Sequence, residues 1–317
     1  MSHRPVAPLH DVDLPAPAAL VDAVAGVFRG PRRTVELALA GVLARGHLLL
    51  EDVPGVGKTT LARALAAALG LQFRRIQFTA DLLPSDILGV SVYDPRTGAF
   101  ETRPGPIFAQ LLLADEINRA PPRTQSALLE AMQEGKVTID DRTLPLPQPF
   151  LVLATQNPLE HHGTYPLPES QLDRFLLRLR LGYPEAEAER ELVAALRPGD
   201  DPVERMRPLL GPGGLAALQA AVDAVHVDPS VLDYLLAVVR ATRSDPRLRL
   251  GASTRAAIAL HHAARALAWV QGRTYVLPDD VRALLGPALG HRLLPADPTL
   301  DVDLVLDELA DAVPVPL

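Results

Sequence analysis

The chain has 317 residues, 48% of them hydrophobic, which is enough for a sizeable core and for two domains. Its net charge of −7 argues against a general nucleic-acid binder, and the absence of cysteine excludes disulfides, thiolate zinc sites and cysteine nucleophiles. The first residues lack the apolar stretch of a signal peptide and no uncharged apolar run reaches membrane-span length, so we expect a cytoplasmic protein without a membrane span.

Residues 1–17 are rich in proline and are expected to form a flexible segment. From residue 18 to 182, strand and helix patterns alternate, which is typical of an α/β fold with a parallel sheet flanked by helices. The strands are expected at 47–50, 73–78, 150–155 and 176–181, with an apolar run at 107–114; the helices are expected at 18–28, 32–44 and 122–133 and from Thr59 onward; and two hairpins are expected within 81–106 and 137–146.

Helical patterns dominate the rest of the chain, and we expect a separate helical domain over 183–317. Its helices are expected at 185–196, 214–225, 229–242, 254–270 and 278–284.

The strand that begins at His47 is followed by a glycine loop and then a helix, which is the order that a phosphate-binding loop requires. The loop and first helical residues are Pro54, Gly55, Val56, Gly57, Lys58, Thr59 and Thr60. The two glycines let backbone N–H groups turn toward phosphate oxygens, Lys58 can reach the outer phosphates, and the Thr59 hydroxyl can bind Mg²⁺. Asp52 stands where the usual loop pattern has its first glycine.

Two further strands end in polar residues that can complete this site. The apolar run 111–114 leads into Asp115 and Glu116, and the strand expected at 150–155 leads into Gln156 and Asn157. In a parallel sheet these positions lie beside the phosphate loop. Asp115 can then hold Mg²⁺ through its water shell, and Glu116 can orient or activate the attacking water. Asn157 could hydrogen-bond that water or the γ-phosphate, although an Asn-Pro pair after a strand is also an ordinary turn.

Taken together, these motifs resemble the MoxR family of AAA+ ATPases. The resemblance is carried by the run 115–134, which begins Asp-Glu-Ile-Asn-Arg, and by 50–59, 154–158, 167–175 and 251–256. It covers roughly residues 20–295 and is most specific over 48–175. It implies a P-loop AAA+ sheet domain followed by an all-α lid, with ATP and Mg²⁺ as ligands.

The resemblance also implies residue roles that spacing alone does not give. Asn157 would be the sensor-1 residue, and Arg174, in Leu-Asp-Arg-Phe, would be the arginine finger that reaches a neighbouring subunit's γ-phosphate. Arg255 would be the sensor-2 arginine, acting on nucleotide bound in the same subunit. Arg119 and Arg123 are alternatives for the residue that acts on the neighbour. Each role uses a planar, permanently charged donor or an amide where γ-phosphate charge is held.

The function that follows from the resemblance is an ATP-driven chaperone-like factor that remodels or matures a partner protein. We expect a homo-oligomer, a hexameric ring, and a client protein with a von Willebrand factor A domain. In relatives the two hairpins line a pore or face a client, and Val27–Gly30 resembles a segment near the adenine. Three alternatives stay open: a nucleotide-gated binding module with little turnover, a nucleic-acid motor, which the acidic balance disfavours, and a small-molecule kinase.

Overall fold

Five short parallel strands form the central sheet. The computed structural model describes residues 14–158, 163–195 and 200–316 of the chain. The strands lie in the order β2-β5-β8-β1-β9. Their bounds are β1 His47–Glu51, β2 Phe73–Gln77, β5 Leu111–Asp115, β8 Leu151–Gln156 and β9 Phe175–Leu179. Because the sheet is covered on both faces, its central strands are continuous apolar runs rather than alternating ones. The predicted α/β class is confirmed.

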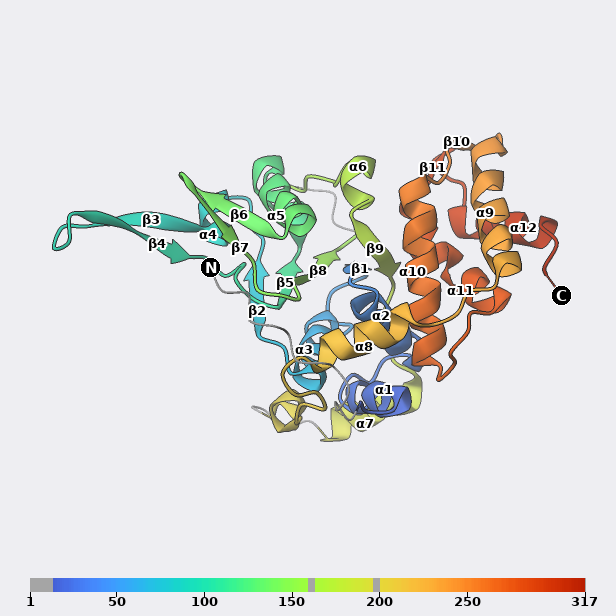
Figure 1. Cartoon of the computed structure of the whole chain (residues 1–317), viewed down its shortest axis with the longest axis horizontal. Coiled ribbons are helices and arrows are strands. Elements are labelled where there is room, and N and C mark those ends of the chain that lie inside the picture. Colours follow the sequence, from blue (N-terminus) through green and yellow to red (C-terminus); the bar gives the residue numbers. More distant parts are fainter. Residues whose placement is uncertain (1–13, 159–162, 196–199, 317) are drawn as a thin grey trace.

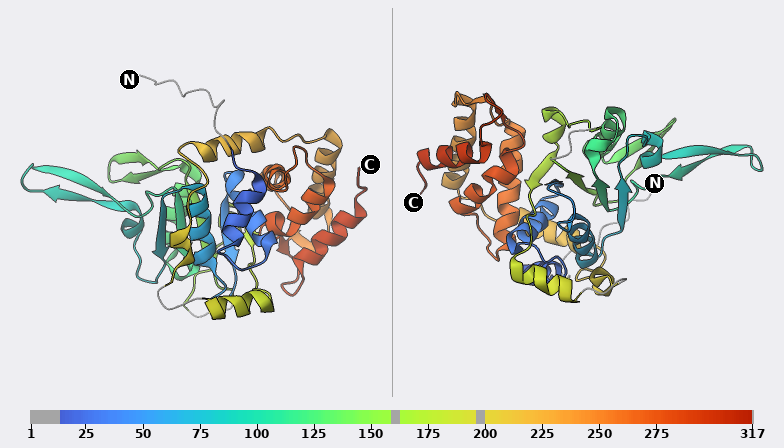
Figure 2. Two further views of the ribbon diagram at one scale, coloured as in Figure 1. Left: turned by 90° about the horizontal axis from the view of Figure 1, so that it is seen from below. Right: turned by 180° about the vertical axis from the view of Figure 1, so that it is seen from behind.

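Helices cover the two faces of this sheet (Figures 1 and 2). Successive side chains of β1 point to opposite faces, so Leu48 and Leu50 join one hydrophobic cluster and Leu49 joins the other. The first cluster contains residues of α1, α2 and α3, and the second contains residues of α5. These helices span α1 Pro17–Ala25, α2 Arg32–Leu43, α3 Lys58–Leu69 and α5 Pro122–Glu134.

Two hairpins extend from the sheet domain, as expected. They are formed by β3 Gly89–Asp94 with β4 Ala99–Pro104, and by β6 Lys136–Ile139 with β7 Arg142–Pro145. The first projects far from the body of the protein (Figure 1). Its directly opposed aromatic residues Tyr93 and Phe100 are both exposed, with ring centroids 5.4 Å apart. A short helix, α4 Pro84–Leu88, precedes this hairpin and was not predicted, because one and a half turns are too short to show a helical period.

The remainder of the chain is mainly helical. It contains α7 Ala186–Ala195, η2 Pro202–Arg205, α8 Gly214–Asp223, α9 Pro229–Ser244, β10 Leu248–Leu250, α10 Thr254–Val270, α11 Pro278–Leu289, β11 Leu294–Pro295 and α12 Val302–Ala312. Helix α11 runs beyond the predicted end at 284, although Pro287 lies inside it. Helix α12 and the small β10–β11 ladder were not predicted. Within the described ranges, no helix has both the length and the apolar character needed to cross a membrane.

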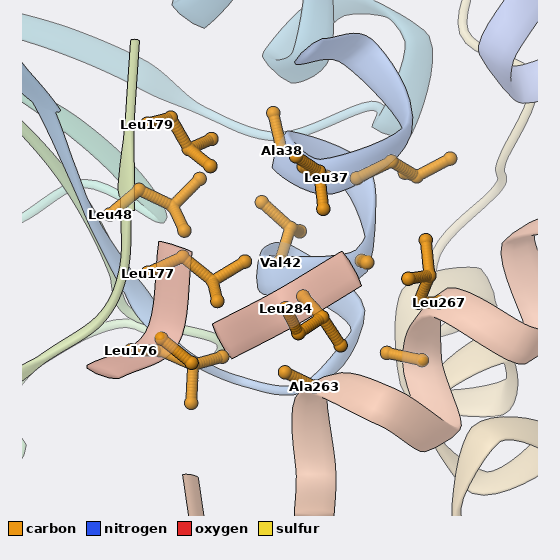
Figure 3. Packing of buried hydrophobic residues seen from close by; sticks show 14 of the residues in the cluster. Leu37, Ala38, Val42, Leu48, Leu176, Leu177, Leu179, Ala263, Leu267 and Leu284 are labelled. Atoms are coloured by element: carbon orange, nitrogen blue, oxygen red, sulfur yellow. The ribbon is translucent and has the colours of Figure 1, made fainter. Parts of the chain in front are cut away.

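The helical region packs directly on the sheet domain. Figure 3 shows Leu37 and Val42 of α2 facing Leu284 of α11 and Leu267 of α10, and all of them belong to one hydrophobic cluster. The cluster therefore continues across the expected boundary near residue 182. The division into 1–17, 18–182 and 183–317 stays a prediction, and residues 1–13 of its first segment lie outside the described residues.

His47 joins the start of β1 to two neighbouring elements. Its Nδ1 accepts a hydrogen bond from the Val152 N–H at 3.0 Å, and its Nε2 lies 3.1 Å from the Met132 carbonyl oxygen. An N–H can only donate, so Nδ1 must be unprotonated and Nε2 must carry the hydrogen. Burial lowers the pKa of His47 to about 4. The neutral ring is thus part of the folded structure.

We expect this histidine to make stability depend on pH. Its folded pKa lies below the ordinary value of 6.5, so its contribution is complete above pH 6.5 and is lost as pH falls toward 4. His47→Gln offers an acceptor and a donor without titrating. The difference in free energy of unfolding between the wild type and His47→Gln should shrink by about 1–2 kcal/mol when the pH is lowered from 7.5 to 5.0. Urea unfolding at both values tests this, and a pH-independent difference would contradict it.

Candidate active site

The predicted phosphate-binding loop lies between β1 and α3. Gly55 and Gly57 have φ values of 89° and 92°, a left-handed conformation that suits glycine. Gly57 caps α3, so the loop ends at a helix N-terminus whose free N–H groups attract anions. Val56 is buried and anchors the loop to the core, whereas Pro54 and Gly55 are exposed. All seven predicted residues, 54–60, lie on this loop and the first turn of α3.

The Lys58 ammonium group binds two backbone carbonyl oxygens beside the loop. It donates to the carbonyl oxygen of Asp52 and to that of Gln156, the latter at 3.4 Å. Gln156 is the last residue of β8, the strand next to β1. Lys58 is therefore held where the loop and the end of the neighbouring strand meet.

Asp52 explains why the loop departs from the usual glycine pattern. Its Oδ1 accepts from the Val53 N–H at 2.8 Å, and its Oδ2 accepts from the N–H groups of Leu181 and Gly182 at 2.8 and 2.7 Å. The carboxylate thus ties the start of the phosphate loop to the segment that follows β9. Glycine has no side chain and could not make these bonds.

The two predicted acidic residues follow one another at the end of β5. Arg75 of β2 donates twice to Asp115 Oδ2, from Nε at 3.0 Å and from Nη2 at 2.6 Å. Glu116 Oε2 accepts from Gln77 Nε2 at 2.8 Å and forms an ion pair with Arg119, whose Nε lies 2.9 Å away. Both carboxylates are therefore held by donors from β2, and that of Glu116 also by η1 (Ile117–Arg119).

Thr155 of β8 positions both acids, and the sequence analysis did not identify this role. Its hydroxyl donates to Asp115 Oδ1 at 2.6 Å and accepts from the Glu116 N–H at 2.8 Å. Glu116 has the left-handed backbone conformation φ 57°, ψ 50°, which costs free energy for a residue with a side chain. The bond from its N–H to Thr155 helps to hold that conformation.

Thr155→Val should therefore weaken the site and destabilise the protein. Valine keeps the shape but leaves the Glu116 N–H without its acceptor, so we expect a loss of about 1–3 kcal/mol in free energy of unfolding. Because Asp115, the expected Mg²⁺ ligand, would lose its hydroxyl donor, we expect ATP turnover to fall about 10- to 100-fold. Thr155→Ser retains the hydroxyl and is the control. Equal turnover in the valine and serine variants would show that Thr155 does not position the acids.

Asn157 comes directly after β8 and is 5% exposed. Because β8 lies between β1 and β5, its end lies between the phosphate loop and the acidic pair. We call this region, where β1, β5 and β8 end, the carboxyl edge. It brings together Lys58, Asp115, Glu116 and Asn157.

Arg174 and Arg255 lie elsewhere, at what we call the amino edge, where β1 and β9 begin. Arg174 immediately precedes β9, which pairs in parallel with β1 from His47 onward. Both arginines line a cleft of about 340 Å³ that also contains His47. Arg255 is 3.5 Å from the carboxylate of Asp173. The structure thus brings the two arginines together but brings neither of them to the phosphate loop of its own chain.

The other candidate arginines lie near the carboxyl edge. Arg119 forms an ion pair with Glu116 of its own chain, and Arg123 is exposed on the first turn of α5.

Comparison with known proteins identifies the family. The ATPase family associated with various cellular activities (AAA) matches residues 47–177, and the AAA lid domain matches residues 240–309. The chain is 48% identical over 301 residues to the uncharacterized protein YeaC of Bacillus subtilis, with 94% of each chain covered. It is 46% identical over 293 residues to the chaperone MoxR1 of Mycobacterium tuberculosis, covering 90% of this chain and 76% of that one. The chain belongs to the MoxR family of AAA+ ATPases.

A solved structure supports the same assignment. A Cytophaga hutchinsonii protein proposed to be an ATPase is 38% identical, with a TM-score of 0.87, and the match covers 95% of this chain and 94% of that one. The predicted family and the AAA+ sheet with a lid are thus confirmed. The MoxR-named relatives make this an AAA+ chaperone-like protein of a nucleotide-binding ATPase family.

In this MoxR-family chain, the Val27–Gly30 segment lies against the phosphate loop. Phe28 is buried, and a Cβ added to Gly57 would come within 3.1 Å of its ring. A cleft of about 550 Å³ adjoins this segment. It is lined by Val27 and Arg29 on one side and on the other by Glu191, Leu192, Ala194, Asp200, Pro202 and Arg205. The cleft has the size of a small-molecule site and is lined by the segment whose Phe28 contacts the phosphate loop.

Proposed function

We propose that the protein binds ATP with Mg²⁺ and hydrolyses it to remodel or mature a partner protein. The observation that carries the proposal is the carboxyl edge, where Lys58, Asp115, Glu116 and Asn157 come together. A binding module needs the loop and its lysine. The acidic pair, held in place by Thr155, is what hydrolysis requires in addition.

Each residue has a role in this proposal. Backbone N–H groups of the loop and Lys58 bind the phosphates. A hydroxyl and a carboxylate are the hard oxygen ligands that suit Mg²⁺, so Thr59 and Asp115 would hold the ion, directly or through water, and the ion would offset phosphate charge. Glu116 would accept a proton from the attacking water, and Asn157 would hold that water or the γ-phosphate. Arg75 shares Asp115 Oδ2 and would compete with the hydrated ion.

The placement of the arginines supports a shared site in an oligomer. Arg174 and Arg255 lie at the amino edge, away from the loop of their own chain, and Ile258 beside them is 54% exposed. We therefore propose that both act on the nucleotide of a neighbouring subunit. For Arg255 this replaces the expected role on its own nucleotide. Such contacts repeated around a closed assembly give a ring, which we take to be hexameric from the family resemblance.

The client would be another protein, and the resemblance favours one with a von Willebrand factor A domain. The projecting β3–β4 hairpin supports a protein partner, since exposed aromatic residues such as Tyr93 and Phe100 are enriched where proteins meet.

ATP turnover per subunit, measured across a series of protein concentrations, tests the proposal. A shared site requires turnover per subunit to rise cooperatively with concentration as subunits assemble. Constant turnover would contradict the shared site, and no turnover at any concentration would favour a nucleotide-gated binding module.

A further inference from the structure

Asp173 connects the amino edge to the helical region. It lies between α6 (Glu169–Leu172) and Arg174. Its Oδ1 accepts from Arg292 Nε at 2.9 Å, and its Oδ2 is 3.5 Å from Arg255 Nη1. Arg292 follows α11 and Arg255 opens α10, so one carboxylate binds two separate elements of the lid.

Arg292 makes the stronger of these two connections. Only 6% of the residue is exposed, and its Nη2 donates to the carbonyl oxygens of Phe175 at 2.7 Å and Asp173 at 3.3 Å. Its Nη1 donates to the Ala288 carbonyl oxygen of α11 at 2.5 Å. The neighbouring His291 Nε2 lies 3.0 Å from the same Phe175 oxygen. The backbone on both sides of Arg174 is thus bonded to the lid.

Arg174 itself is held from the other side. Its Nη1 donates to the Leu129 carbonyl oxygen of α5 at 2.5 Å. The guanidinium of Arg174 therefore binds the sheet domain, whereas the neighbouring residues Asp173 and Phe175 bind the lid. A change in lid position that moved Arg292 would move the backbone that carries Arg174.

We infer that Asp173 and Arg292 are positioning residues that hold Arg174 and Arg255 as one unit against the triphosphate of ATP bound to a second copy of this chain. The inference rests on the proposed function. In this arrangement, movement of the lid acts on the neighbour's site through the amino edge. That direction of coupling follows from the contacts of Arg292, which reach the amino edge.

Asp173 and Arg292 would make the same contacts if their role were only to stabilise the fold. A buried ion pair is weak evidence of function, and removing one partner always leaves the other charge uncompensated. The chain offers a matched control in Asp280, a buried carboxylate that binds Arg273 inside the lid at 2.7 Å and lies in neither edge. Asp280→Asn should lower stability without changing the arginines at the amino edge.

Mixing of variant subunits separates the two roles. Asp173→Asn keeps an intact phosphate loop and Glu116, so it should bind ATP normally but turn it over at least about 10-fold more slowly. Glu116→Gln is inactive at its own site but supplies well-placed arginines. Mixing equal amounts should give several-fold more turnover than the sum of the two separate proteins. Asp280→Asn should show a reduced melting temperature, near-normal turnover per folded subunit and no gain on mixing.

The outcomes are distinct. A gain on mixing supports the inference. No gain for Asp173→Asn, when Arg174→Ala mixed in the same way does show a gain, overturns it and leaves the proposed function intact. Absence of turnover in the wild type overturns both. If circular dichroism shows that Asp173→Asn is unfolded, Asp173→Glu replaces it, because it keeps the charge while moving the carboxylate by one methylene; the same gain is then required.

Discussion

ATP turnover by the Glu116→Gln variant is expected to fall by about 10²- to 10⁴-fold, whereas its affinity for ATP should stay close to that of the wild type. The amide can still accept from Gln77 and occupies the same volume, but it cannot take a proton from water. Phosphate binding depends on the loop and on Lys58, which the substitution does not touch.

Equilibrium binding of a fluorescent ATP analogue and steady-state phosphate release measure the two quantities separately. Glu130→Gln is a matched control, because it makes the same chemical change on the exposed face of α5 and should leave both unchanged. Unchanged turnover in Glu116→Gln would exclude Glu116 as the base. Loss of ATP binding would instead mean that the change had disturbed the loop.

Much of this site was predictable because its signals are local. A strand, two glycines, a lysine and a threonine lie within 47–60, and the acidic pair directly follows an apolar run. Within a few residues, each of these patterns indicates both the local backbone conformation and the ligand-binding or catalytic groups that it carries. The central strands β1, β5 and β8 were likewise visible as short apolar runs, because a sheet covered on both faces needs no alternation.

The parts that were not predicted depend on contacts between distant segments. Thr155 acts on residues 39 and 40 positions away, and Asp52 binds N–H groups 129 and 130 positions away. No spacing rule connects such positions. Arg255 shows the same limit, since its motif was recognisable but the edge of the sheet that it reaches depends on how the lid packs on α2 and β9.

Replacing Arg174 by alanine is the second large effect that we expect. An arginine supplied to a neighbour's γ-phosphate is worth about 10³-fold or more in turnover, so Arg174→Ala should lower turnover by at least that factor. ATP binding should be unaffected, because Arg174 lies at the amino edge and the loop lies at the carboxyl edge. Arg174→Lys should recover little, because an ammonium group lacks the planar fork that binds two oxygens.

Arg123→Ala is the informative comparison, because that arginine is exposed at the start of α5 and is the competing candidate for the contact with a neighbour. We expect near-normal turnover for it, measured in the same concentration series. If Arg123→Ala instead shows the large loss and Arg174→Ala does not, the contact between subunits is made by α5 and not by the amino edge. Arg174 also binds the Leu129 carbonyl oxygen, so its replacement can also destabilise the fold. A loss of turnover in Arg174→Ala therefore supports the shared site under two conditions. The variant must have the melting temperature of the wild type, and mixing it with Glu116→Gln subunits must restore activity.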